Sequence, residues 1–206
     1  LLAQNQKGLN NLFKLISESY TQKYFYRFPR IDHKLLAKYS EGIIATSACL
    51  GGVYAQDMWQ NRDDKEAAMA AMRKTTDKMV SVFGDRWYGE LQWNAIPEQH
   101  DLNQMIIDVC TEKGVKLVST ADAHYPRPEL WKDRELYKKL GWLSKGDMDT
   151  SLPESIDDMS YELYPKNGNQ MWESYKKYSS MLTRDYDDEL VLKSITESSL
   201  IANDRI

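Results

Sequence analysis

An α/β fold, with parallel strands covered by helices, is the fold class that this sequence predicts. Three short segments have the character of buried strands, at residues 42–47, 86–93 and 115–120. Between them lie two segments with apolar residues at helical spacing, residues 63–83 and 97–113. Strands that alternate with helices favour a parallel sheet, because a parallel connection needs a long crossover.

The amino-terminal part predicts a further helix and an irregular loop. Residues 8–20 form an amphipathic helix by the spacing of their apolar residues, which are Leu9, Leu12, Phe13, Ile16 and Tyr20. Residues 24–30 are an aromatic and basic loop, and Asp32 can cap a short helix that runs through Lys38. Gly51 and Gly52 permit a tight turn after the first buried strand.

Beyond residue 126 the pattern is helical. Residues 129–142 and 187–203 are the clearest helices, and residues 144–160 between them are polar and irregular. The acidic stretch of residues 147–189 is most simply a solvated face. The first three residues have the character of a strand, so we expect the chain to be a piece of a longer protein.

Composition excludes several classes of protein. The chain has 206 residues, 42% hydrophobic and 28% charged, with a net charge of −4, which is ordinary for a globular protein. Two cysteines make no disulfide framework and predict a reducing cytoplasm. No segment is apolar enough to cross a membrane, so no membrane partner is expected. The acidic balance argues against attraction of nucleic acid to the whole surface, but not against a local basic face.

Asp122 and His124 are the strongest candidates for chemistry. They follow the buried strand of residues 115–120, and side chains two residues apart in a strand point to the same side. A carboxylate and an imidazole aimed at one point are credible ligands for a divalent metal ion. A helix cap beside an ordinary surface imidazole explains the same residues equally well.

Other candidates have simpler explanations that the sequence favours. Cys49 follows a strand and could bind zinc as a thiolate, but a small buried residue in a tight turn is the commoner role of a free cysteine. Glu90 could be a base behind the metal ligands, or a carboxylate that caps the end of the sheet. Cys110 lies on the apolar face of a helix, so we expect it to pack in the core. His33 and His100 lie in polar segments, so we expect both to be surface residues.

Residues 24–30 could also contact nucleic acid. Their aromatic rings could stack on bases while Arg27 and Arg30 touch phosphates. A partly buried loop cluster is the more common explanation for such residues.

Nine short blocks follow one another in a fixed order along the chain. The blocks are Leu1-Leu2-Ala3, Gly8-Leu9-Asn10-Asn11-Leu12, Pro29-Arg30-Ile31-Asp32, Glu41-Gly42-Ile43-Ile44, Ser47-Ala48-Cys49-Leu50-Gly51-Gly52, Phe83-Gly84-Asp85-Arg86, Glu90-Leu91-Gln92, Pro97-Glu98-Gln99 and Ala121-Asp122-Ala123-His124-Tyr125-Pro126-Arg127-Pro128-Glu129. This ordered series resembles the PHP (polymerase and histidinol phosphatase) domain at the front of bacterial and phage DNA polymerase III alpha subunits, and it is more specific than any single block. The resemblance covers residues 1 to about 130, whereas residues 140–185 match poorly.

The resemblance implies a partial distorted (β/α) barrel with a helical carboxyl-terminal extension. Residues 1–143 would be the carboxyl-terminal part of the PHP domain, and residues 144–206 would end this region and lead toward a polymerase core. Cys49, Asp122 and His124 match positions that hold metal ions in the family, with zinc or manganese as the implied ions. The family's His-x-His pair belongs upstream of Leu1, so we expect these three ligands to be insufficient for a hydrolytic site of several metals.

The resemblance also implies the function. The parent protein would be a DNA-directed DNA polymerase that uses Mg²⁺, and the PHP domain would be a metal-dependent phosphoesterase, a 3′–5′ exonuclease or a scaffold. A stand-alone phosphoesterase of the same superfamily is an alternative. The implied partners are DNA, proofreading or other replisome subunits, and a second chain at the exposed edge of the truncated barrel. We expect no catalytic residue to act in this segment alone.

Overall fold

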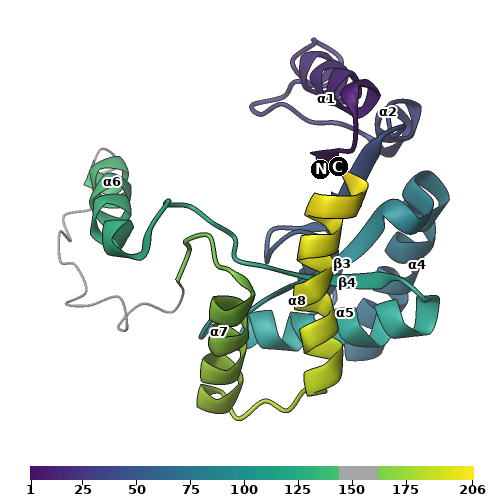
Figure 1. Ribbon diagram of the computed structural model, residues 1–206. Coiled ribbons are helices and arrows are strands. Elements are labelled where there is room, and N and C mark those ends of the chain that lie inside the picture. Colours follow the sequence, from purple (N-terminus) through teal and green to yellow (C-terminus); the bar gives the residue numbers. More distant parts are fainter. Residues whose placement is uncertain (144–161) are drawn as a thin grey trace.

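The structure, a computed structural model, describes residues 1–143 and 162–206 (Figure 1). The predicted irregular segment of residues 144–160 lies outside these residues. The strands and helices, in chain order, are β1 (Leu2–Ala3), α1 (Gln6–Ser19), α2 (His33–Lys38), β2 (Ile43–Thr46), α3 (Val53–Gln60), α4 (Lys65–Phe83), β3 (Trp87–Gln92), α5 (Pro97–Lys113), β4 (Lys116–Thr120), α6 (Trp131–Leu143), α7 (Gly168–Met181) and α8 (Asp188–Leu200).

The strands of the described residues form one sheet in the order β1-β2-β3-β4. β2, β3 and β4 are parallel, as the alternation of strands and helices predicts, and the register pairs Thr46 with Tyr88 and Gln92 with Thr120. β1 differs, because it pairs with β2 in the antiparallel sense. The α/β class is therefore confirmed, while the expectation that the strands are parallel is wrong for β1.

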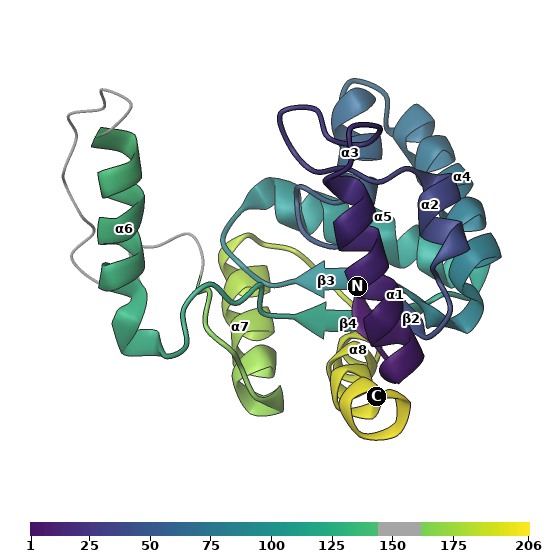
Figure 2. The ribbon, with the colours of Figure 1, turned by 90° about the horizontal axis from the view of Figure 1, so that it is seen from above.

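The two faces of the sheet are buried in different clusters. On one face, strand residues pack in the same cluster as α4 and α5, and this cluster is the main core (Figure 2). On the other face, Ile44, Tyr88 and Val118 pack against Ile201, which lies just after α8. Neighbouring residues such as Ile43 and Ile44 enter opposite clusters because successive strand side chains point to opposite faces.

Helix α1 forms where the spacing predicts, but its apolar stripe faces outward. The buried positions are instead Gly8, Asn11, Leu15 and Ser19. Gly8 is pressed against the turn before β2, where a Cβ on Gly8 would lie 1.8 Å from the Gly42 carbonyl oxygen. Asn11 Nδ2 donates to the Glu41 carbonyl at 2.9 Å. The close backbone contact decides which face of the helix is inward, and leaves exposed the side chains of Leu9, Phe13, Ile16 and Tyr20.

Capping signals mark the helix ends correctly. Asp32 Oδ1 accepts from the Leu35 amide at 2.7 Å and begins α2, and Gly114 ends α5 with a φ of 66°. Helix α3 is not predicted by the sequence; it follows the Gly51–Gly52 turn and is separated from α4 by residues 61–64, of which Asp64 caps α4. Helix α7 lies in the region beyond residue 126 whose pattern is helical, although the sequence does not predict its bounds.

Helix α8 lies along β4, the edge strand of the sheet (Figure 1). Ser198 Oγ donates to the Ser119 carbonyl at 2.7 Å, so a helix side chain satisfies one carbonyl of the strand. The two ends of the chain meet near α1, where Gln4 Nε2 donates to the Arg205 carbonyl at 3.1 Å. None of the helices in the described residues is long and apolar enough to span a membrane.

His100 is buried, contrary to the expectation of a surface position. Nε2–H donates to the Asn94 carbonyl at 2.8 Å, and Nδ1 accepts from the Tyr186 hydroxyl at 2.8 Å. Burial lowers the pKa of this imidazole, and it packs against the indole of Trp93. Tyr186 comes from the α7–α8 connection, 86 residues away in sequence, which no local pattern around His100 could indicate.

Candidate functional site

Polar side chains gather at the carboxyl ends of the three parallel strands. Thr46 ends β2, Glu90 and Gln92 lie near the end of β3, and Thr120 ends β4. Glu90 receives a hydrogen bond from each of the other three: Thr46 Oγ1 donates to Oε2 at 2.6 Å, Gln92 Nε2 to Oε1 at 2.9 Å and Thr120 Oγ1 to Oε1 at 2.6 Å. One carboxylate therefore joins three neighbouring strands.

Glu90 lies within β3 rather than beyond its end, and it is only 8% exposed. A buried carboxylate is costly unless its oxygens accept hydrogen bonds. Here both oxygens accept, and the amide of Glu90 donates to Ser47 Oγ at 2.9 Å. This arrangement favours the alternative in which Glu90 caps the sheet, because neighbouring strands already use both of its oxygens.

Asp122 and His124 lie beyond β4, which ends at Thr120, so the strand alternation does not apply to them. Asp122 has a left-handed φ of 47°, and the turn brings His124 Nδ1 within 2.6 Å of the Asp122 carbonyl. Since a carbonyl only accepts, Nδ1 carries the proton and Nε2 is left with a lone pair. The Asp122 carboxylate lies 4.0 Å from Nδ1, on the same side of the ring as the carbonyl that Nδ1 contacts and not on the side of Nε2.

Cys49 is partly exposed in the turn between β2 and α3. The turn is tight, because the Gly52 amide donates to the Cys49 carbonyl at 2.7 Å and a Cβ on Gly52 would meet the Ser47 carbonyl at 2.0 Å. The other cysteine, Cys110, is fully buried as predicted, and burial raises the pKa of its thiol to about 12. Cys110 is therefore a packing residue rather than a thiolate ligand.

The described residues do not fit a complete metal site. Within residues 1–143 and 162–206, no group of three or more His, Cys, Asp or Glu side chains lies close enough together to hold a metal ion. Cys49, Asp122 and His124 therefore do not form a three-ligand set here. His124 alone has the arrangement of a ligand, because metal-binding histidines usually donate their second ring N–H to an acceptor such as a carbonyl.

The segment of residues 162–166 covers the ends of β3 and β4. The amides of His124 and Tyr125 both donate to the Leu163 carbonyl, at 2.7 and 3.1 Å. The hollow between this segment and the strand ends has a volume of about 10 Å³, and its lining includes Asp122 and Lys166. Such a volume holds about one water molecule and no phosphate ester.

Two charged groups in this cover are partly buried. Lys166 Nζ donates to the Glu162 carbonyl at 2.6 Å, and burial lowers the pKa of this amine. Burial alone would raise the pKa of Glu162, but the hydrogen bond from Lys177 and the charges of Lys177 and Lys166 lower it below its usual range. Neither residue was among the candidates from the sequence, because both lie in the stretch of residues 140–185, which matches the family poorly.

Arg27 and Arg30 are not part of this edge of the sheet. They lie in the exposed loop between α1 and α2, and the Tyr26 ring lies between 5 and 6 Å from both guanidinium groups, at 5.6 Å from Arg27 and 5.4 Å from Arg30. The rings of Phe25, Tyr26 and Phe28 are exposed, contrary to the expectation of a partly buried cluster, whereas Tyr24 is partly buried against the main core.

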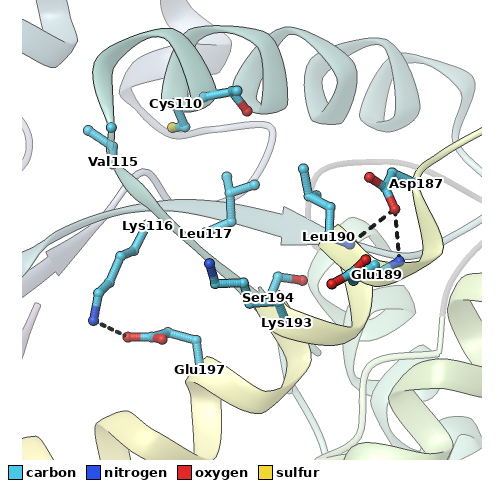
Figure 3. Close-up of a pocket in the computed structure, with 12 residues that line it drawn as sticks. Cys110, Val115, Lys116, Leu117, Asp187, Glu189, Leu190, Lys193, Ser194 and Glu197 are labelled. Atoms are coloured by element: carbon cyan, nitrogen blue, oxygen red, sulfur yellow. Dashed lines mark hydrogen bonds and ion pairs between the residues drawn. The ribbon is translucent and has the colours of Figure 1, made fainter.

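A separate hollow of about 430 Å³ lies between the end of α5, β4 and α8 (Figure 3). Lys116 and Glu197 form an ion pair of 3.0 Å beside it. Asp187 accepts from the Glu189 and Leu190 amides and so caps α8. The side chains of Lys116, Glu197 and Asp187 therefore already have partners within the protein.

Comparison with known proteins finds similarity to one domain family and to one kind of polymerase subunit. Residues 1–94 match the family model described as PHP domain. The DNA polymerase III subunit alpha of Aquifex aeolicus is 43% identical over 129 residues, covering 63% of this chain and 10% of the relative. The same subunit of Borreliella burgdorferi is 35% identical over 176 residues, which cover 85% of this chain and 14% of the relative.

The DNA polymerase III subunit alpha of Helicobacter pylori strain 26695 extends the similarity to 94% of this chain, at 31% identity. The chain spans 10–16% of the length of these three relatives. The likeness therefore includes the sheet and its carboxyl edge, and continues into the helices that follow.

Proposed function

Because residues 1–94 belong to the PHP domain family and the chain is similar to DNA polymerase III alpha subunits along most of its length, we propose that it is a segment of a DNA polymerase III alpha-like protein. In this proposal, residues 1–143 contribute the later part of a PHP barrel and residues 144–206 lead toward the polymerase core. The whole protein synthesises DNA on a template in the cytoplasm, together with other replisome subunits.

The role that the geometry favours for this segment is a scaffold. The observation that carries the proposal is the use of Glu90, whose two oxygens accept from Thr46, Gln92 and Thr120. A carboxylate that binds metal or activates water needs an oxygen that faces the site. At this edge the carboxylate instead joins strands, which rigidifies the sheet.

The space at the strand ends supports the same role. The segment of residues 162–166 leaves a hollow of about 10 Å³ beside Asp122, which excludes a nucleotide. Within this cover the partly buried Glu162 and Lys166 form an ion pair of 3.6 Å, and Lys177 of α7 donates to Glu162 Oε1 at 2.7 Å, which ties the cover to α7. A domain closed in this way is suited to brace a larger protein or to bind a partner subunit.

A metal-dependent phosphoesterase is the second candidate, and His124 favours it. Its Nδ1–H donates to a carbonyl, so Nε2 is available to a zinc or manganese ion, with Cys49 and Asp122 as the further ligands that the family implies. Since the described residues do not gather these three side chains, this candidate requires a different arrangement of the strand ends.

Activity and metal content of the purified chain test the two candidates. The scaffold predicts no turnover of a 3′-labelled oligonucleotide with Mn²⁺ or Zn²⁺, and no bound metal by elemental analysis after dialysis. Metal-dependent exonuclease activity that His124→Ala abolishes would overturn the scaffold. The matched control is His33→Ala, which changes an exposed histidine at the start of α2. A gene that encodes no polymerase region after Ile206 would instead support a stand-alone phosphoesterase.

A further inference from the structure

The loop between α1 and α2 exposes an unusual number of aromatic rings. Tyr26 is 63% and Phe28 72% exposed, and Phe25 and Tyr20 are also exposed. The rings of Tyr20 and Phe25 stack with centroids 5.9 Å apart. Figure 1 shows this loop beside α1, away from the helices that cover the sheet. Residues 20–30 are called the aromatic loop below. Large exposed rings that are close together indicate a binding surface.

Cations surround the aromatic loop. Residues 14–38 contain the six cations Lys14, Lys23, Arg27, Arg30, Lys34 and Lys38, but only Glu18 and Asp32 as acids. This local net charge of +4 contrasts with −4 for the chain. None of the six forms an ion pair within the part of the chain that the structure describes, and Asp32 is already used as the cap of α2.

The cations and rings are interleaved rather than separate. Both Arg27 and Arg30 lie over the Tyr26 ring. Beside the loop, a hollow of about 270 Å³ lies between the end of α1 and α2, and Lys23, Lys34 and Lys38 line it together with Glu18, Tyr24 and Leu35. The hollow has room for a phosphate group, and its three lysines outweigh the one carboxylate, so the charge of the lining is positive.

We propose that the aromatic loop and the lysines beside it bind single-stranded nucleic acid. Unpaired bases stack on exposed rings such as Tyr26 and Phe28, and phosphates bind Arg27, Arg30 and the lysine-lined hollow. A duplex is excluded from the stacking contacts, because its bases are already stacked on one another. An anionic membrane would use the cations but not the interleaved rings, and a purely apolar protein surface would leave the cations unpaired. The proposal does not depend on the family or on the scaffold role.

Fluorescence anisotropy of the whole chain with a labelled oligo-dT of about 15 nucleotides tests this proposal. At about 50 mM salt, we expect a Kd between about 1 and 100 µM. Arg27→Ala/Arg30→Ala is expected to weaken binding roughly tenfold or more, and to reduce the slope of log K against log salt by about 1.4, since each lost phosphate contact contributes about 0.7 for single strands.

A second variant separates stacking from charge. Phe28→Ala removes an exposed ring and no charge, and is expected to weaken binding by about fivefold or more without changing the salt slope. The matched charge control is Arg62→Ala/Lys193→Ala, which removes two exposed cations far from the loop in sequence. This control is expected to change the Kd by less than about twofold. Circular dichroism checks that all variants are folded.

Several results would overturn the proposal. One is the absence of binding at millimolar protein, and another is equal weakening by the loop and control pairs, which would indicate attraction without a site. Tighter binding to duplex than to oligo-dT, or binding to phosphatidylserine vesicles but not to oligo-dT, would also contradict it. So would an unchanged Kd in Phe28→Ala, because stacking would then contribute nothing.

Discussion

The hydroxyl of Thr120, the last residue of β4, donates to Oε1 of Glu90 in β3 at 2.6 Å. The same carboxylate accepts from Thr46 at the end of β2, so its charge is shared by three parallel strands. Glu90 has no cation as a partner among the ion pairs of the described residues, and neutral donors balance its burial. The edge of the sheet is therefore sensitive to small changes in these side chains.

Glu90→Gln tests this network. The amide replaces one acceptor oxygen with a donor that faces a hydroxyl or amide donor, and we expect the free energy of unfolding to fall by about 1–3 kcal/mol. Urea unfolding measures the change. Glu173→Gln, at an exposed position of α7, is the matched control, with an expected change within about 0.5 kcal/mol. Equal stability of the two variants would show that the network contributes little.

The contact between Gly8 and Gly42 yields a second prediction. Gly→Ala inside a helix usually stabilises by about 0.5–1 kcal/mol. At Gly8 the new Cβ would lie 1.8 Å from the Gly42 carbonyl oxygen, so we expect Gly8→Ala to destabilise by about 1–3 kcal/mol or more.

Gly141→Ala in α6 is the control for this change. A Cβ at Gly141 meets no atom within 4 Å, so this variant is expected to gain the usual helix stability. Thermal unfolding compares the two variants. A rise in Tm for Gly8→Ala would mean that α1 does not approach the Gly42 turn as described.

Glu162 predicts a dependence of stability on pH. Lys177 and Lys166 hold its pKa below the ordinary value of 4.5 in the folded protein. Its contribution to stability is therefore fully present above pH 4.5 and is lost as the pH falls through the lower, folded pKa. We expect Glu162→Gln to lower the urea midpoint at neutral pH, and the difference from the native chain to shrink near about pH 3. A difference that is constant with pH, as expected for Glu173→Gln, would contradict this.

The exposed stripe of α1 predicts self-association. Phe13 and Ile16 are 57% and 58% exposed, on the same face of the helix as Leu9 and Tyr20. Sedimentation velocity at increasing concentration is expected to reveal oligomers that Phe13→Glu weakens, because the apolar stripe is buried between copies. Leu192→Glu, at an exposed position of α8, is the control and should leave association unchanged. A monomer at high concentration would contradict the prediction.

Local patterns in the sequence are sufficient to place most helices and strands. Helix starts follow from cap residues such as Asp32, and the end of α5 follows from Gly114, since these depend on hydrogen bonds and dihedral angles of a few adjacent residues. The order of the sequence blocks is also sufficient to indicate the PHP family, which the match over residues 1–94 confirms.

Only the tertiary structure decides what each face of an element contacts. The helical spacing of α1 is evident from its sequence, but its inward face is determined by the contact of Gly8 with Gly42, which lies 34 positions later. Likewise, the polar neighbours of His100 predict exposure, yet Tyr186 buries it. Glu90 binds Thr46 and Thr120 because parallel strands place their ends together. Periodicity is a property of neighbouring residues, whereas burial depends on contacts between residues far apart in the chain.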